Sequence, residues 1–171
     1  LWHQQGLTYQ PKTNIENRWK TKEAFDFCNN IIAKFPKSKG AEKCTVLKQQ
    51  IEQQSLQITT EDFLPVQQDS RLLIRYKNTN ELHFNVFKLT QKEFKTFNSY
   101  YNEVEQLAFI KALKNPLEWT ITLKNEQDYQ THTTEVLLPK LDNGRYLIFA
   151  SPEKEKEQTF AFGTIQVTNL A

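Results

Sequence analysis

Apolar residues recur every three or four positions in the first third of the chain, which is the pattern of amphipathic helices. In residues 17–35, "NRWKTKEAFDFCNNIIAKF", this spacing predicts one helix, which Pro36 ends. Ser38 is placed to cap a second helix that continues to Ile51. Because only "PKSKG" separates the two, we expect an antiparallel helical hairpin. Its apolar positions are Ala24, Phe27, Cys28, Ile31, Ile32 and Phe35, then Ala41, Cys44, Leu47 and Ile51.

After Ser55 the hydrophobic period changes to two, the alternation typical of half-buried β-strands. About seven such runs, separated by turn-forming segments, predict an antiparallel seven-stranded β-sandwich. Within "KLDNGRY", the pair Asn143 and Gly144 tolerates positive φ angles, so we expect a tight hairpin turn between the flanking strands. The runs are "LQITT", "SRLLIRYKN", "ELHFNVFKL", "LEWTITL", "HTTEVLL", "GRYLIFA" and "TFAFGTIQV".

Helical spacing returns between the third and fourth predicted strands, in residues 91–114, before Asn115 and Pro116. We expect one inserted helix lying across the sandwich. Its aromatic stripe is interpreted as core, and a partner surface is the alternative. The stripe consists of Phe94, Phe97, Tyr101, Val104, Leu107, Ala108, Ile110 and Leu113.

The predicted organisation is a helical segment over residues 1–54 followed by a β-sandwich domain over 55–171, with the helical insertion near 91–114. A chain of 171 residues buries roughly 70% of its unfolded surface, so a conventional core suffices. The first residues, "LWHQQGLTYQ", include neither an initiating Met nor a signal segment. We therefore expect the chain to be part of a longer protein, whose localisation cannot be read from this end.

Charge and hydropathy exclude two classes of partner. The 22 Lys and Arg against 20 Asp and Glu give a net charge of +2, and the two signs are interspersed, so we expect no nucleic-acid partner. The longest apolar run has the length of "YLIFA", far short of the roughly 18 residues of a membrane span.

Few side chains are arranged as a metal site or a catalytic site would require. His3, His83 and His132 have no second His or Cys at ligand spacing, so we predict no metal site. Asp128 and His132 are four residues apart; we interpret them as a hydrogen bond that fixes a loop, the alternative being a catalytic pair. No Gly-x-Ser-x-Gly occurs, and four glycines cannot assemble a phosphate-binding loop. We predict neither an enzyme nor a bound cofactor, and name no catalytic residue.

Cys28 and Cys44 form the one suggestive pair. Each lies eight residues from Pro36, because 36 − 28 and 44 − 36 both equal 8, so the hairpin brings them to the same level. A disulfide there would stabilise the fold by roughly 3 kcal/mol and would indicate an oxidising compartment. Close packing of two small buried residues is the alternative, because helix axes usually stand about 8 to 10 Å apart.

The three tryptophans suggest a second hypothesis for the function, ligand binding. Trp2, Trp19 and Trp119 are candidate stacking platforms for a sugar or a peptide. Trp119 alternates with polar neighbours in a predicted strand, where a position in the sandwich core is the competing interpretation.

Beyond these patterns, the sequence resembles a known family. "A-F-x-F-C-x-x-I-I-x-K-F-P-K-S-K-G-A-x-x-C" is similar to a tetratricopeptide-type hairpin. From about residue 17 to 171 the chain resembles the N-terminal region of large bacterial alpha-2-macroglobulin-like proteins of the Bacteroidetes type. The residues that carry this resemblance are Tyr76, Lys77, Asn78, Trp119, Leu123, Asp128, Tyr129, His132, Leu138, Pro139, Leu141, Gly144 and Tyr146.

The resemblance implies a helical segment leading into a macroglobulin-type, fibronectin-III-like β-sandwich. It also implies a periplasmic or cell-envelope protein, attached to the outer membrane through a lipid anchor outside this chain, whose parent traps proteases. In that family the chemistry belongs to a bait region and a Cys-Gly-Glu-Gln thioester, whereas here Cys28 precedes Asn-Asn and Cys44 precedes Thr-Val. We therefore expect a non-catalytic structural and interaction domain, with other domains of the parent chain and proteases as partners. The alternative is a glycan- or peptide-binding module of a cell-surface system.

Overall fold

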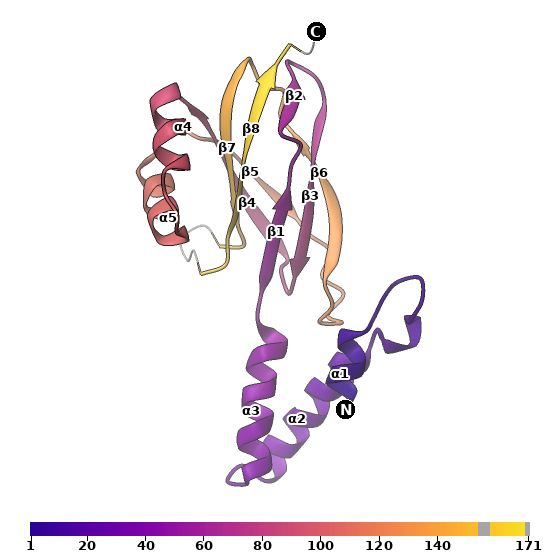
Figure 1. The fold of residues 1–171 in the computed structure, drawn as a ribbon. Coiled ribbons are helices and arrows are strands. Elements are labelled where there is room, and N and C mark those ends of the chain that lie inside the picture. Colours follow the sequence, from indigo (N-terminus) through magenta and orange to yellow (C-terminus); the bar gives the residue numbers. More distant parts are fainter. Residues whose placement is uncertain (154–157, 170–171) are drawn as a thin grey trace. The chain divides into compact units, whose positions relative to one another are not determined.

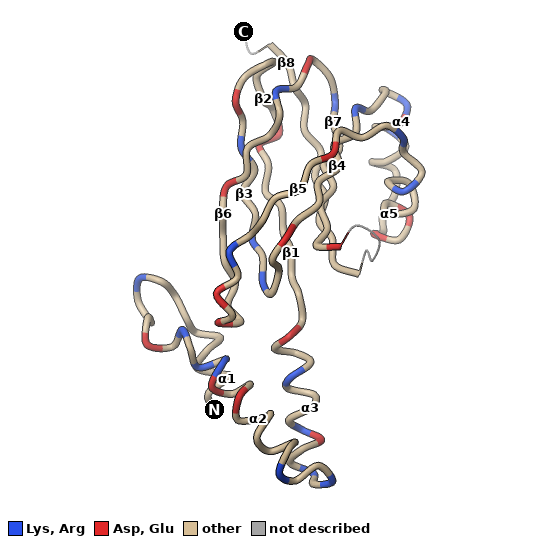
Figure 2. The backbone as a smooth tube through the Cα atoms, turned by 180° about the vertical axis from the view of Figure 1, so that it is seen from behind, with Lys and Arg blue, Asp and Glu red and all other residues tan. Residues whose placement is uncertain are grey.

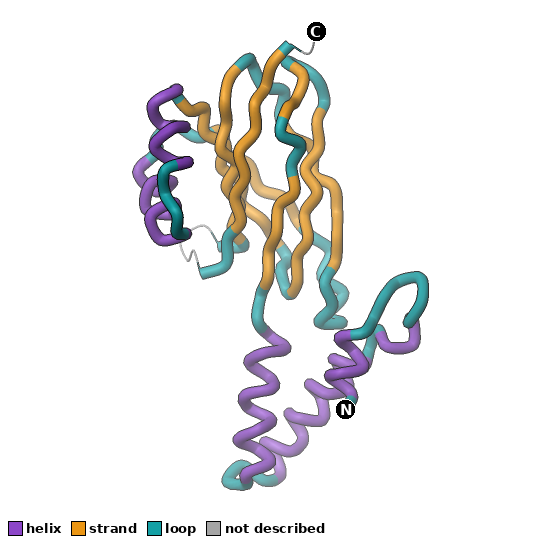
Figure 3. Tube along the Cα trace, in the orientation of Figure 1, coloured by secondary structure: helices purple, strands orange, loops and turns teal. Residues whose placement is uncertain are grey.

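The fold is described from a computed structural model, in which residues 1–153 and 158–169 are described. The chain divides into two compact units, shown by the ribbon in Figure 1 and by element type in Figure 3. The predicted boundary at residue 54 stays a prediction. The helical unit also contains two short segments from the second part of the sequence. The helical unit comprises Leu1–Ser55, Tyr76–Asn80 and Lys124–His132; the sandwich unit comprises Leu56–Arg75, Glu81–Leu123 and Thr133–Ala171, of which 154–157 and 170–171 lie outside the described residues.

The helical unit contains the predicted hairpin. Helix α2 spans Lys20–Lys34 and helix α3 spans Lys39–Glu52. The Ser38 hydroxyl accepts a hydrogen bond from the Ala41 N–H at 3.1 Å, which confirms the predicted cap. A short helix α1 (Trp2–Leu7) and a 3-10 turn η1 (Ile15–Asn17) precede them, and α1 packs on α2.

The strands form two sheets, which confirms the predicted β-sandwich. One sheet has three strands in the order β1-β3-β6, and the other has five in the order β2-β8-β7-β4-β5. The described residues contain eight strands rather than the predicted seven. Their bounds are β1 Ser55–Thr59, β2 Phe63–Pro65, β3 Ser70–Lys77, β4 Glu81–Leu89, β5 Leu117–Thr122, β6 His132–Leu138, β7 Gly144–Ser151 and β8 Ala161–Thr168.

The additional strand is β2, which pairs parallel with β8 and so departs from a purely antiparallel arrangement. The chain leaves the three-stranded sheet after β1 and enters the five-stranded sheet only three residues later. A strand of three residues is too short to show a period, and its last residue, Pro65, has no N–H for a ladder. The sequence pattern therefore could not reveal it.

The predicted hairpin in "LLPKLDNGRYLIFAS" is wrong. Strand β6 belongs to the three-stranded sheet and β7 to the five-stranded sheet, so the segment crosses between sheets. Gly144 has φ 158°, whereas Asn143 is not among the residues with positive φ, so the pair cannot form the two-residue turn. Instead the Tyr146 hydroxyl donates to the Asp142 carbonyl at 3.0 Å, a corner typical of sandwiches.

The five-stranded sheet is buried on both faces. Because alternate residues of β4 and β7 are paired in register, Phe84 and Ile148 point to the inside of the sandwich and Phe87 and Leu147 to the outside. The outer face forms a second core with the inserted segment. That core consists of Phe87, Leu89, Phe97, Ile110, Leu147 and Phe149, with Phe94, Leu107, Phe109, Leu113, Phe160 and Phe162 packed against it.

The insertion contains two helices, not the one predicted: α4 (Gln91–Asn98) and α5 (Glu103–Ala112). The Asn102 side chain accepts a hydrogen bond from the Glu105 N–H at 2.9 Å and starts a new helix. This break displaces part of the predicted stripe, so that Tyr101 is 98% exposed while Phe97 is 3% exposed. Val104, which is 78% exposed, and Ala108 also lie outside the core, whereas Phe94, Phe97, Leu107, Ile110 and Leu113 of the predicted stripe belong to it or pack against it.

We expect Phe97→Ala to lower the free energy of unfolding by about 3–5 kcal/mol, because it opens a cavity between the helices and the sheet. Tyr101→Ala is the matched control, with an expected change within about 0.5 kcal/mol. Equilibrium urea unfolding of both variants measures the difference. Equal losses would contradict this placement of the two aromatic rings.

Candidate functional site

The most connected polar group of the helical unit is the carboxylate of Asp128, which is 1% exposed. It accepts hydrogen bonds from Arg18 Nε at 2.9 Å and from the Gln130 N–H at 3.0 Å. His132 Nε2 lies 2.9 Å from Oδ1 of Asp128, the oxygen that also accepts from the Gln130 N–H. This contact confirms the predicted Asp128–His132 hydrogen bond. We call Asp128, Arg18, Gln130 and His132 the Asp128 cluster.

The cluster keeps a buried carboxylate ionised. Burial alone would raise the pKa of Asp128, but hydrogen bonds from His132, the Gln130 N–H and Arg18 hold that pKa below its usual value. Arg18 also pairs with Glu126, so one guanidinium serves two carboxylates of the same loop. An ion in this position stabilises the fold only while its partners remain in place.

Gln130 joins the loop to α1 and to the residues just before α2. Its side-chain amide donates to the carbonyl of Gly6 at 3.2 Å and to the carbonyl of Arg18 at 2.9 Å. A Cβ at Gly6 would lie 2.0 Å from Thr21 Oγ1 and 2.7 Å from the Thr21 backbone nitrogen. Gly6 is therefore required for the close approach of α1 to α2.

Asn78 makes the corresponding connection at the end of α3. It has φ 55°, and its side chain donates to the carbonyls of Ile51 at 2.7 Å and Gln53 at 3.2 Å. These carbonyls belong to the last turn of α3, where the helix itself supplies no donor. Gln54 donates back to the Asn78 carbonyl at 3.2 Å.

Tyr76 completes the framework of the loop. Its hydroxyl donates to the Lys124 carbonyl at 2.8 Å, and its ring lies against His132 with centroids 5.9 Å apart. Burial, followed by the nearby charge of Asp128, raises the pKa of this phenol. Tyr76 thus contacts both ends of the loop that contains Asp128.

The structure places the two cysteines next to each other as free thiols. Cys28 is buried and Cys44 is half-buried. Burial and a hydrogen bond to Cys44 raise the pKa of the Cys28 thiol to about 11. Such a thiol is a poor nucleophile and a poor metal ligand. The disulfide between Cys28 and Cys44 remains a prediction.

An apolar hollow of about 450 Å³ lies beside this pair, between α1, α2 and α3. Exposed apolar side chains line it: Leu1, Phe27 and Trp2, whose ring packs edge-on against that of Phe27 with centroids 5.7 Å apart. In the described part of the chain, His3 Nδ1 is buried without a hydrogen-bond partner. Burial, with the charges of Lys77 and the N-terminus, lowers the pKa of His3.

The other two tryptophans each pack against a neighbouring side chain. Trp19 lies under the guanidinium of Arg18, 5.0 Å from it. Trp119 is half-buried and stacks on Phe84 with centroids 4.8 Å apart and an interplanar angle of 6°. Both indoles are thus engaged in packing within the protein.

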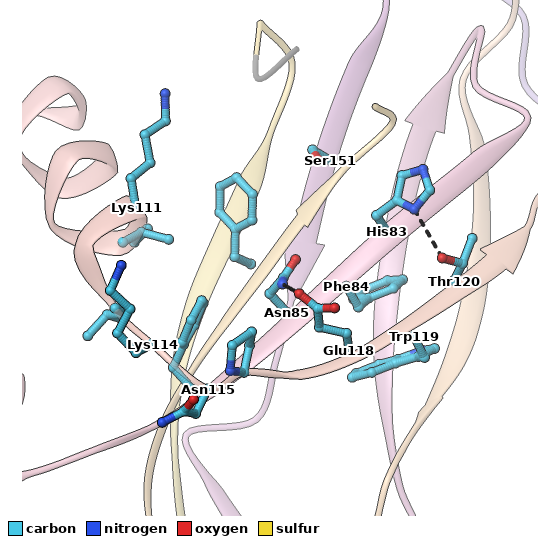
Figure 4. Close-up of a pocket in the computed structure, with 15 residues that line it drawn as sticks. His83, Phe84, Asn85, Lys111, Lys114, Asn115, Glu118, Trp119, Thr120 and Ser151 are labelled. Carbon is cyan, nitrogen blue, oxygen red and sulfur yellow. Dashed lines mark hydrogen bonds between the residues drawn. The ribbon is translucent and has the colours of Figure 1, made fainter. Parts of the chain in front are cut away.

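The sandwich unit has a polar cleft of about 470 Å³, which we call the β5 cleft. One wall is the outer face of β4 and β5, where Asn85 donates to Glu118 at 2.8 Å and His83 bonds Thr120 at 3.0 Å. The other wall is the end of α5 and the segment after it, from which the side chains of Lys111 and Lys114 extend (Figure 4). These residues were not predicted, because they come from separate segments that only the sheet brings together.

Charges of both signs are distributed along the helices and the strands (Figure 2). Among the described residues, no three His, Cys, Asp or Glu side chains are grouped to hold a metal ion. No helix in residues 1–153 or 158–169 combines the length and apolar character needed to cross a bilayer. The predicted absence of a metal and of a catalytic centre remains a prediction.

Comparison with known proteins adds similarities of fold at low scores. No family model and no curated protein matches the sequence. Among solved structures, the chain is similar to the CARDB domain of PF1109 from Pyrococcus furiosus, with 13% identity over 69% of this chain and 94% of that chain, and a TM-score of 0.36. It is also similar to native alpha-2-macroglobulin from Escherichia coli spanning domains MG0-NIE-MG1, with 17% identity over 66% of this chain and 39% of that chain, and a TM-score of 0.42. Such scores do not assign a family.

Two members of the Asp128 cluster were missed by the sequence reasoning. Arg18 and Gln130 lie about a hundred positions apart along the chain, so no local spacing could pair them. One signal was available for Asn78, because Asn in the turn "KNTN" is a residue that tolerates positive φ.

We expect Asp128→Asn to lower the free energy of unfolding at neutral pH by about 3 kcal/mol, because it leaves Arg18 without its buried partner. The folded-state pKa of Asp128 is depressed, so its contribution is present above the unfolded pKa and is lost as the pH falls below about 4. Thermal unfolding across this range therefore shows a smaller loss on acidification for the variant than for the wild type.

Asp26→Asn is the matched control for that experiment. Asp26 is exposed and, among the described residues, forms its ion pair with Lys22, at 2.7 Å, so the expected change is below about 1 kcal/mol. Parallel acid profiles for the wild type and Asp128→Asn would contradict the role given to this carboxylate.

We expect Cys28 and Cys44 to resist alkylation until reduced when the chain is expressed in an oxidising compartment. Intact mass under non-reducing conditions, with and without alkylation, measures this. After reduction, Cys28 in the folded chain should react more slowly than Cys44, because its pKa is raised and it is buried. Ready labelling of both in the unfolded but unreduced chain would exclude a bridge.

Proposed function

We propose that this chain is a non-catalytic structural and interaction domain of a larger alpha-2-macroglobulin-like protein of the bacterial cell envelope, of the Bacteroidetes type, whose parent traps proteases. The observation that carries the proposal is the Asp128 cluster. Asp128 and His132, the pair in the sequence closest to catalytic chemistry, make hydrogen bonds that fix a loop to helices. The same buried carboxylate is among the residues that carry the resemblance.

Other resemblance residues have structural contacts of the same kind. Tyr76 and Asn78 bond the loop and the end of α3, and Tyr146 bonds the corner between the sheets. Residues that make such contacts suit a scaffold that positions neighbouring domains. The exposed apolar residues around the hollow beside Cys28 support packing against further domains of the parent chain.

The glycan-binding alternative is less well supported. A sugar site needs an exposed aromatic face, whereas Trp119 is stacked on Phe84 and Tyr146 is 6% exposed. An envelope or periplasmic location, with a lipid anchor outside this chain, is part of the proposal through the resemblance. The predicted bridge between Cys28 and Cys44 would agree with such a compartment.

The test uses the full-length parent protein and a serine protease of broad specificity. A trapping inhibitor encloses the protease, so we expect hydrolysis of a large protein substrate to fall at least about tenfold while hydrolysis of a small peptide substrate persists. This chain alone should inhibit neither reaction. Subcellular fractionation with an antibody against this chain should place the parent in the envelope fraction.

Equal loss of both hydrolytic activities would indicate an active-site inhibitor and contradict trapping. No effect on either activity, with the parent intact, would remove the protease partner from the proposal. Recovery of the parent in the cytosolic fraction would exclude the envelope assignment and with it the proposed family role.

A further inference from the structure

The turn of the helical hairpin concentrates the positive charge of the chain. Residues 34–43, "KFPKSKGAEK", which we call the hairpin tip, contain four Lys and one Glu and so have a net charge of +3. The whole chain has 22 Lys and Arg against 20 Asp and Glu, which leaves 18 against 19 outside the tip, a net charge of −1. The positive excess of the protein therefore belongs to one short segment.

The lysines of the hairpin tip are accessible from solvent. Figure 2 shows Lys in blue where α2 passes into α3. All four ammonium-bearing side chains are exposed, and in the described part of the chain none of them forms an ion pair. Their charge is thus available to an anionic partner. The four are Lys34, Lys37, Lys39 and Lys43.

An aromatic ring is exposed among these charges. Phe35 is the C-cap residue of α2 and is 58% exposed. Its N–H donates to the Ile31 carbonyl at 2.9 Å, and Pro36 ends the helix directly after it. The Ser38 cap then starts α3. Phe35 is therefore held at a fixed position of the backbone while much of its ring remains in water.

This combination distinguishes among anionic partners. A nucleic acid is bound through phosphate contacts spread along a track, whereas the lysines of the tip are gathered at one turn. An acidic peptide needs a groove that orders it, whereas the tip is a turn exposed at eight of its ten residues. A bilayer surface needs neither, because its headgroup phosphates cover a plane and the acyl boundary beneath them accepts an aromatic ring.

We propose that the hairpin tip binds the surface of a bilayer that contains anionic phospholipids. The four ammonium groups lie among the headgroup phosphates, which their long side chains can reach from successive turns. Phe35 inserts at the boundary between headgroups and acyl chains. One ring and four charges give a peripheral, reversible contact. It is separate from the lipid anchor, which the resemblance places outside this chain.

Flotation of the complete chain with lipid vesicles tests the proposal. One set of vesicles is phosphatidylcholine alone, and the other contains about one-third phosphatidylglycerol. We expect the chain to float only with the second set. Raising the NaCl concentration from about 0.05 to about 0.5 M should release it, because salt screens exposed charges. Polyglutamate, which has negative charge but no acyl boundary, is the comparison partner and should bind more weakly.

Matched lysine variants separate the tip from the other charges of the chain. Lys37→Glu combined with Lys39→Glu should lower the partition coefficient at least about 25-fold, since each lysine near an anionic surface contributes about fivefold. Acidic residues are favourable at the start of α3, so the variant should keep the fold. Lys92→Glu combined with Lys95→Glu, an equal change of charge at exposed positions of α4, is the control and should lower it less than about threefold.

Matched aromatic variants test the insertion of the ring. Phe35→Ala should lower the partition coefficient about five- to tenfold, because the ring loses its transfer from water to the acyl boundary. Tyr101→Ala, which removes a ring that is 98% exposed in the sandwich unit, should leave it unchanged. Circular dichroism of every variant verifies that the fold is retained.

The proposal is overturned if the chain floats with neither set of vesicles or equally with both. Equal effects of the two lysine pairs, or wild-type binding by Phe35→Ala, would also overturn it. Tighter binding to polyglutamate than to the anionic vesicles would indicate an acidic protein partner instead of a bilayer. None of these results bears on protease trapping by the parent, so this inference and the proposed function can fail separately.

Discussion

The helical unit depends on one ionised carboxylate held out of water. Asp128 is 1% exposed, and a charge in that position is tolerated only because Arg18, His132 and the Gln130 N–H all bond to it. Arg18, which is 110 positions from Asp128 in the sequence, must therefore reach the same point in the fold. A buried ion with several specific donors gives a single arrangement, because any other leaves the charge unpaired.

The sandwich unit follows a different rule, the burial of apolar area on two faces of one sheet. The inner face of β4 and β7 contributes to the sandwich, while Phe87, Leu147 and Phe149 on the outer face pack with α4 and α5. A sheet covered on both sides needs nearly continuous apolar strands, as β7 shows in "YLIFA". In the described part of the chain, β5 stays at the edge of this sheet and pairs only with β4.

Polar groups of the helical unit are engaged in fixing loops to helices, and the reactive potential of Cys28 is lowered by its raised pKa. The open surfaces are an apolar hollow beside α1 and a polar cleft beside β5.

Local pattern alone determined the helical hairpin, the cap at Ser38, most of the strands and the aromatic core of the insertion, because each depends on periodicity or on a single capping residue. The pairing of Asp128 with His132 was also within reach, since the two lie four residues apart. Tertiary structure decided the rest. Three features depend on which surfaces meet and not on spacing. They are the crossing of the chain between sheets from β1 to β2, the corner at Tyr146 and the helix break before Asn102. Arg18 and Gln130 join the cluster, and Asn85 and Glu118 line one cleft, only because folding brings distant segments together, which no local period encodes.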